Sequence, residues 1–127
     1  MMRLDSDLLD ALQASVEGRV SDGDFKWSPD PAVCVVMASG GYPGAFEAGK
    51  LLSGVDEADR IYGVKVFHAG TTRRDGAFYT VGGRVLGVTS RASDLATAVE
   101  RVYAAVSKIG FEGAHYRKDI ASRALKK

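Results

Sequence analysis

The sequence predicts an α+β fold, in which a small antiparallel sheet packs against flanking helices. Three observations support this fold class. An unbroken apolar stretch over Ala32–Ala38 is typical of a buried strand. Alternating residues over 64–89, interrupted by Asp75-Gly76 and Gly82-Gly83, indicate strands joined by short turns. The segment Ala92–Ile109 then repeats apolar residues at helical spacing.

Length and composition are those of an ordinary globular domain. The chain has 127 residues, of which 46% are hydrophobic and 26% charged. Its 17 basic and 16 acidic residues give a net charge of +1, so we expect no nucleic-acid partner, because such binding needs a basic face. We also expect no membrane association, since no apolar run has the length of a membrane helix.

The amino-terminal part predicts one helix and one loop before the first strand. A helix over 5–17 would present an apolar face made of Leu8, Leu9, Leu12 and Val16. The polar residues 21–31 predict a loop that holds one anchor, Trp27. The single cysteine, Cys34, lies in the apolar strand and is expected to be a buried small hydrophobe. It has no cysteine partner in the chain, which fits a reducing cytoplasm.

The middle of the chain predicts a meander of three strands. A glycine-rich turn over Ser39–Gly44 and a short helix over Val55–Ile61 come first. The three strands are then expected at Val64–Ala69, Ala77–Val81 and Arg84–Thr89. Short turns separate them, so we expect each strand to pair with its neighbour in the chain.

The longest helix is predicted over Ala92–Ile109. Ser93 or Asp94 is a suitable N-cap and Gly110 a suitable end. The apolar stripe that would face the sheet consists of Leu95, Val99, Val102, Val106 and Ile109. The basic tail after it predicts at most a short helix.

Few residues suggest chemistry by themselves. The two histidines, His68 and His115, belong to no cluster with the spacing of metal ligands, and we expect neither a metal site nor a catalytic residue. Gly82-Gly83-Arg84 could hold a phosphate, because glycines leave backbone N–H groups accessible and arginine adds a charged fork. A hairpin turn beside a surface arginine is the alternative. For His68, a structural, hydrogen-bonded role is the simpler interpretation.

Five segments carry a resemblance to a known family. They read RLDSDLL (3–9), VVMASGGYPG (35–44), GVKVFHAGT (63–71), GGRVLGVT (82–89) and AVERVYAAVSKIGFEGAHYRKDIA (98–121). In this order they resemble the C-terminal domain of phosphoribosylamine–glycine ligases (glycinamide ribonucleotide synthetases) of the ATP-grasp superfamily. The resemblance implies a small β-rich domain of the rudimentary hybrid-motif, or half-barrel, type.

The resemblance also implies an activity for the intact enzyme. Such a ligase joins glycine to 5-phosphoribosylamine in purine biosynthesis through a glycyl phosphate, using ATP and Mg²⁺ or Mn²⁺. No segment here matches the family's amino-terminal domain, ATP-grasp domain or metal-ligand motif. We therefore expect residues 1–127 to be one C-terminal domain, linked to the ATP-grasp domain by the helix over 5–17. ATP and metal would bind outside this chain, and the chain alone would be inactive.

Site residues follow from the same resemblance. In related enzymes with phosphoribosyl substrates, arginines in the strand similar to GGRVLGVT hold the ribose 5-phosphate, and Arg84 is the matching arginine. The domain would thus position phosphoribosylamine for reaction. The alternative is a scaffold that packs on the ATP-grasp domain without touching substrate. The further candidates for substrate binding are Gly82, Gly83, His68, Gly70, Gly40 and Gly41.

Overall fold

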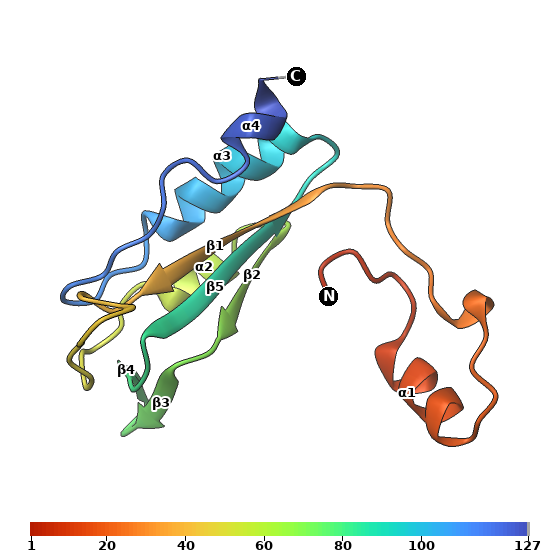
Figure 1. The fold of residues 1–127 in the computed structure, drawn as a ribbon, viewed down its shortest axis with the longest axis horizontal. Coiled ribbons are helices and arrows are strands. Elements are labelled where there is room, and N and C mark those ends of the chain that lie inside the picture. The colour runs from red at the N-terminus through yellow and green to blue at the C-terminus, as the bar shows by residue number, and fades with distance from the viewer. Residues whose placement is uncertain (127) are drawn as a thin grey trace.

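The structure is a computed structural model that describes residues 1–126, and it confirms the α+β fold class (Figure 1). A three-stranded antiparallel sheet has helices packed on one face, and a two-stranded ribbon extends from one end of it. The elements in chain order are α1 (Leu8–Val16), η1 (Asp22–Asp24), β1 (Ala32–Ala38), α2 (Val55–Asp59), β2 (Val64–His68), β3 (Thr71–Arg74), β4 (Ala77–Thr80), β5 (Arg84–Arg91), α3 (Leu95–Val106) and α4 (Ser122–Leu125).

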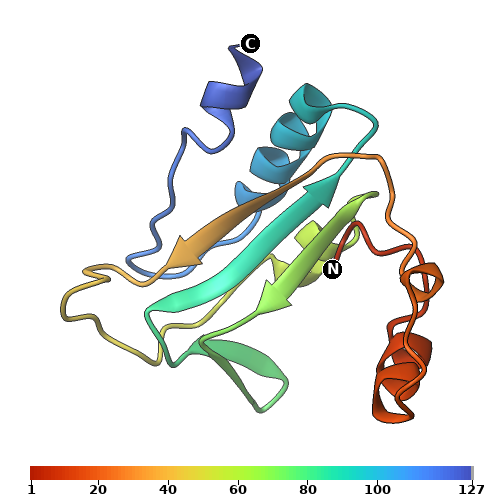
Figure 2. The ribbon, with the colours of Figure 1, turned by 45° about the vertical axis from the view of Figure 1, so that its right-hand side comes forward.

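The strand order corrects the predicted meander. The sheet has the order β1-β5-β2, so β2 pairs with β5 and not with the strand that follows it. The hairpin of β3 and β4, turning at Asp75-Gly76, forms a separate ribbon (Figure 2). The reason is a close backbone crossing at the base of the ribbon, where Val81 N–H donates to the carbonyl of Gly70 (2.8 Å). This crossing lets β2 and β5 continue side by side.

The core lies between the sheet and α3. In the register, Val35, Val88 and Val66 are opposite one another on three neighbouring strands, and all three are buried. From the predicted stripe, Val102, Val106 and Ile109 are buried, and Leu95 and Val99 are partly buried. The Asp94 carboxylate accepts a hydrogen bond from Thr97 N–H (2.9 Å), which confirms the N-cap and lowers the pKa of Asp94.

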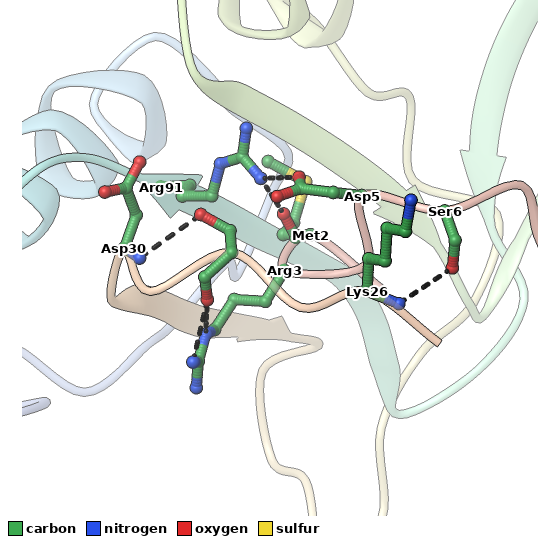
Figure 3. Close-up of polar contacts among 8 residues, drawn as sticks. Met2, Arg3, Asp5, Ser6, Lys26, Asp30 and Arg91 are labelled. Carbon is green, nitrogen blue, oxygen red and sulfur yellow. Dashed lines mark hydrogen bonds and ion pairs between the residues drawn. The ribbon is translucent and has the colours of Figure 1, made fainter. Parts of the chain in front are cut away.

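Residues 1–31, which we term the arm, lead away from the sheet and contain α1 and η1 (Figures 1 and 2). Figure 3 shows how the arm is attached: Arg91 Nη1, at the end of β5, donates to the Met2 carbonyl (3.1 Å) and to Asp5 Oδ1 (2.7 Å). Within the arm, Arg3 Nη2 donates to the Ser28 carbonyl (2.8 Å). Arg91 therefore fixes the start of the chain against the sheet.

The predicted apolar face of α1 is exposed. Leu9 is 69% exposed and Leu12 55%, whereas the small residues Ala11 and Ala14 are buried. The alanine side of the helix packs against the rest of the arm. Within residues 1–126, no part of the sheet reaches the leucines of α1, so these side chains stay exposed. Helical periodicity identified the element correctly but assigned the wrong side to the interior.

Two further burial predictions are wrong. Trp27 is 58% exposed, because its backbone pairs with Leu4 in the arm and its side chain does not enter the core. Cys34 is an exposed free thiol, because β1 alternates and directs its neighbours Val33 and Val35 inward. The sheet thus has a second, outer face that carries apolar side chains.

An ion pair attaches the end of α2 to β2, the strand that ends at His68. Burial alone would raise the pKa of Asp59, but Lys65 Nζ (2.6 Å) and Val66 N–H (2.7 Å) donate to its carboxylate and hold the pKa below its ordinary value. This stabilisation is present above pH 3.8, the ordinary pKa, and is lost as the pH falls through the lower pKa of the folded state.

Substitution in α3 tests the buried face. Val102→Ala should lower the free energy of unfolding by about 1–3 kcal/mol, because Val102 is fully buried against the sheet. Glu100→Ala, on the exposed side of the same helix, should change it little. Equal denaturant midpoints for the two variants would show that the helix face is misassigned.

The Asp59 contacts predict a pH dependence. Between pH 5 and pH 2.5 the free energy of unfolding should fall less steeply for Asp59→Asn than for the unaltered chain, because the variant has no carboxylate to protonate. Urea titrations at each pH measure this slope. Glu57→Gln, at an exposed position of the same helix, is the control and should keep the original slope; an original slope in Asp59→Asn would contradict the assignment.

Candidate functional site

Two glycines cross at the end of the sheet. Gly70 N–H donates to the carbonyl of Arg84 (2.9 Å), directly beside Gly82. A Cβ on Gly70 would lie 2.8 Å from the Cα of Gly82, too close for any side chain. Because neither glycine has a side chain, the end of β2 and the start of β5 can approach one another closely here.

The glycine turn that follows β1 is attached to this crossing. Ser39 is buried; its N–H donates to the Gly83 carbonyl (2.8 Å) and its Oγ to the Gly82 carbonyl (2.9 Å). The ring of Tyr42 occupies the space that a side chain on Gly83 would fill, since a Cβ there would be 2.1 Å from Tyr42 Cδ2. The N–H groups of Gly82 and Gly83 donate to no acceptor within residues 1–126.

An open depression of about 600 Å³ lies beside the Tyr42 ring. Arg84 and His68 line it together with Gly83, and Val36 and Phe67 extend it along the outer face of the sheet. Arg84 is exposed, and no carboxylate in the described part of the chain pairs with it. The depression therefore combines one available guanidinium with an apolar wall.

His68 has a fixed orientation at this depression. Its Nδ1 lies 2.9 Å from Thr71 Oγ1, and its ring lies 4.3 Å from the ring of Phe78, centroid to centroid. The hydrogen-bonded structural role predicted for His68 and its position in the depression are both compatible with this geometry.

The structure brings some of the predicted site residues together and separates others. His68, Gly83 and Arg84 share the depression, and Gly70 and Gly82 form the crossing under it. Gly40 and Gly41 do not line it. Gly40 packs against Gly113, and Gly41, at φ +93°, closes the turn against Ala45.

Gly40 instead lines a separate depression of about 470 Å³ that contains Lys50. Lys50 Nζ pairs with Glu47 (2.8 Å) and Glu112 (3.0 Å), which raises the pKa of Lys50 and lowers that of Glu47. These pairs connect the segment that follows the glycine turn to the loop after α3. The arrangement is a cross-link between loops, in which one ammonium is shared by two carboxylates.

Tyr42 is the site residue that sequence analysis missed. Its position between a glycine pair and a proline in the turn Ser39–Gly44 was the available signal. Within residues 1–126, no three His, Cys, Asp or Glu side chains gather closely enough to hold a metal ion. The same residues include no helix with the length and apolar character needed to cross a membrane.

Comparison with known proteins identifies the family. A family profile described as "Phosphoribosylglycinamide synthetase, C domain" matches residues 32–123. A phosphoribosylamine–glycine ligase of Rhodopirellula baltica is 47% identical over 126 residues, which cover 98% of this chain and 29% of that protein. The chloroplastic ligase of Arabidopsis thaliana is 49% identical over 128 residues, covering 99% of this chain and 24% of that protein.

A solved structure supports the same assignment. The crystal structure of phosphoribosylamine–glycine ligase from Thermotoga maritima matches with a TM-score of 0.71 and 31% identity, covering 87% of this chain and 26% of that one. The chain therefore spans less than a third of the length of these relatives. On the family profile and these identities, the chain belongs to the phosphoribosylglycinamide synthetase C-domain family.

Proposed function

We propose that this chain is the substrate-side C-terminal domain of an ATP-dependent phosphoribosylamine–glycine ligase, which joins glycine to 5-phosphoribosylamine in purine biosynthesis. Relatives at 47–49% identity carry that enzyme name and support the parentage. The observation that carries the substrate-side role is the depression in which an exposed, unpaired Arg84 lies beside His68 and Gly83.

In this proposal Arg84 binds the 5-phosphate of phosphoribosylamine. A guanidinium can hold two phosphate oxygens at once, and the N–H group of Gly83, which lines the depression and donates to no acceptor within residues 1–126, can add a further donor. Phosphate binding neutralises charge and holds the ribose in one orientation. The amine nitrogen is then directed toward an activated glycine, which lowers the entropic cost of the encounter.

The remaining chemistry belongs to parts of the ligase outside this chain. We assign ATP, Mg²⁺ or Mn²⁺, and glycine to the ATP-grasp and amino-terminal domains, and α1 to the link toward them. ATP with its metal would supply the phosphoryl group that activates glycine. The free, exposed thiol of Cys34 supports a reducing compartment, and we place the protein in the cytoplasm.

A scaffold without substrate contact is the second candidate function. The exposed apolar side chains on the outer face of the sheet favour it, because such surfaces mark contacts with other protein parts. The two candidates differ in one respect: only the substrate-side role requires Arg84.

Arg84→Ala separates them in a whole ligase. We define the chimera as the R. baltica relative with its matching segment replaced by this chain. In the chimera, Arg84→Ala should raise KM for phosphoribosylamine by roughly 10- to 100-fold through loss of charged hydrogen bonds, while KM for ATP and for glycine stays unchanged. Arg84→Lys should recover only part of the loss, because lysine lacks the planar fork.

Arg73→Ala is the matched control for this experiment. Arg73 is an exposed arginine on the β3–β4 ribbon, outside the depression, and its loss should leave all three constants unchanged. If Arg84→Ala folds normally and its KM for phosphoribosylamine equals that of Arg73→Ala, the scaffold role is correct.

The chain by itself should have no ligase activity. ADP release dependent on phosphoribosylamine, glycine and ATP should stay at background for the purified chain, because the proposed ATP and metal sites lie outside it. The chimera serves as the positive control in the same assay. Turnover that remains with the chain through repeated purification would contradict the proposed division of the sites.

A further inference from the structure

A cleft of about 690 Å³ lies where the arm meets the sheet. It adjoins Arg91, the last residue of β5, whereas the depression with the proposed substrate site adjoins Arg84, the first residue of that strand. Its volume is within the usual range of small-molecule sites in proteins. Side chains of both charges line it, namely Asp5, Asp30, Arg91 and Arg101.

Arg91 and Asp5 neutralise one another. Arg91 Nη1 donates to Asp5 Oδ1 (2.7 Å) and to the Met2 carbonyl (3.1 Å), as Figure 3 shows. The hydrogen bond to Asp5, together with the nearby negative charge of Asp30, raises the pKa of Arg91 above its ordinary value. This pair therefore forms a fixed wall of the cleft, and a ligand of the cleft has to be bound by other charges.

Arg101 lies in the cleft without an acidic partner. Its Nη1 donates to the Arg91 carbonyl (2.8 Å), and its Cζ lies 5.7 Å from the centroid of the Tyr62 ring. Gly63 leaves room for the guanidinium, since a Cβ there would be 2.5 Å from Nη1. Arg101 is half-buried, and no carboxylate of residues 1–126 forms an ion pair with it. The guanidinium is therefore held in one position while its charge stays available.

Asp30 supplies the opposite charge. It lies just before β1, and its backbone N–H donates to Ser28 Oγ (3.2 Å), which holds the residue in its loop. Asp30 is half-buried, and its carboxylate forms no ion pair in the part of the chain that the structure describes. The cleft thus presents one available anion, Asp30, and one available cation, Arg101.

We infer that this cleft binds a small zwitterion, an α-amino acid with an apolar side chain. The Asp30 carboxylate pairs with the ammonium group of the ligand, and the Arg101 guanidinium donates to both oxygens of its carboxylate. The side chain of the ligand packs against Met2, Leu4 and the ring of Tyr62, which also line the cleft. Tyr62 is 88% exposed, so most of its ring surface is open to such a contact.

A ligand with a single charge fits the cleft less well. An anion would leave Asp30 unpaired beside it, and a cation would leave Arg101 unpaired, and either arrangement in a half-buried cleft costs free energy. Because Arg84 and His68 do not line the cleft, binding there goes beyond the proposed substrate role and does not depend on it.

L-phenylalanine is the probe, and two analogues each lack one of its charges. Phenethylamine has no carboxylate, and 3-phenylpropanoate has no ammonium group. Each compound is titrated into the ¹⁵N-labelled chain at neutral pH, and the backbone NMR signals of Gly63 and Arg101 are followed. Phenylalanine should bind saturably and roughly 10-fold more tightly than either analogue, because each analogue loses one ion pair. Glycine, which has both charges and no side chain, should bind more weakly than phenylalanine.

Two substitutions assign each end of the ligand to its partner. Asp30→Asn should weaken the binding of phenylalanine and phenethylamine by roughly 10-fold and should not weaken that of 3-phenylpropanoate. Arg101→Gln should weaken the binding of phenylalanine and 3-phenylpropanoate and should not weaken that of phenethylamine. Asp10→Asn on α1 and Arg74→Gln on the β3–β4 ribbon remove the same charges at exposed positions outside the cleft. These controls should bind phenylalanine as the unaltered chain does.

The unaltered chain can refute the inference without any variant. No saturable binding of phenylalanine, or equal affinity for phenylalanine and one of the two analogues, would overturn it. Equal weakening of all three compounds in Asp30→Asn or Arg101→Gln would also overturn it, because the charges would then not be matched one to one. If Arg101→Gln does not fold, Arg101→Lys takes its place, since lysine keeps the charge but cannot donate to both carboxylate oxygens from a planar fork.

Discussion

Backbone segments at the end of the sheet approach one another more closely than side chains would permit, and the site depends on that approach. Gly70 crosses Gly82, and the ring of Tyr42 fills the space next to Gly83. Because of the crossing, β2 and β5 pair directly and the β3–β4 ribbon leaves the sheet. His68 and Arg84, which end and begin those two strands, therefore lie in one depression.

Much of this fold could be predicted from local patterns. The strand β1, the helix α3 with its Asp94 cap and the turn at Asp75-Gly76 depend on neighbouring residues in the chain. The pairing of β2 with β5 does not depend on neighbouring residues in the chain. Turn signals predict a hairpin, but they do not predict which strands share a sheet. Exposure of Cys34 was missed for a related reason: a strand with apolar residues on both faces has the same sequence pattern whether its second face is buried or exposed.

The sequence predicted the charged and polar residues of the candidate site, but it did not predict how the surrounding residues shape the depression. Arg84 and His68 were found by resemblance and residue type, and the structure places both in the same depression. Tyr42 was missed because its position depends on an absent side chain at Gly83, about 40 residues away in sequence. Two exposed apolar side chains, Val36 and Phe67, line the same depression as Arg84 and His68.

Comparison of two glycine substitutions in the chain tests the central claim that the site depends on positions where no side chain fits. Gly83→Ala should lower Tm by several degrees and shift the NMR signals of the Tyr42 ring, because its Cβ would lie 2.1 Å from Tyr42 Cδ2. Gly87→Ala, where the nearest atom to a Cβ is 3.5 Å away, should change neither Tm nor those signals. Identical Tm values and unshifted Tyr42 signals in both variants would contradict the account.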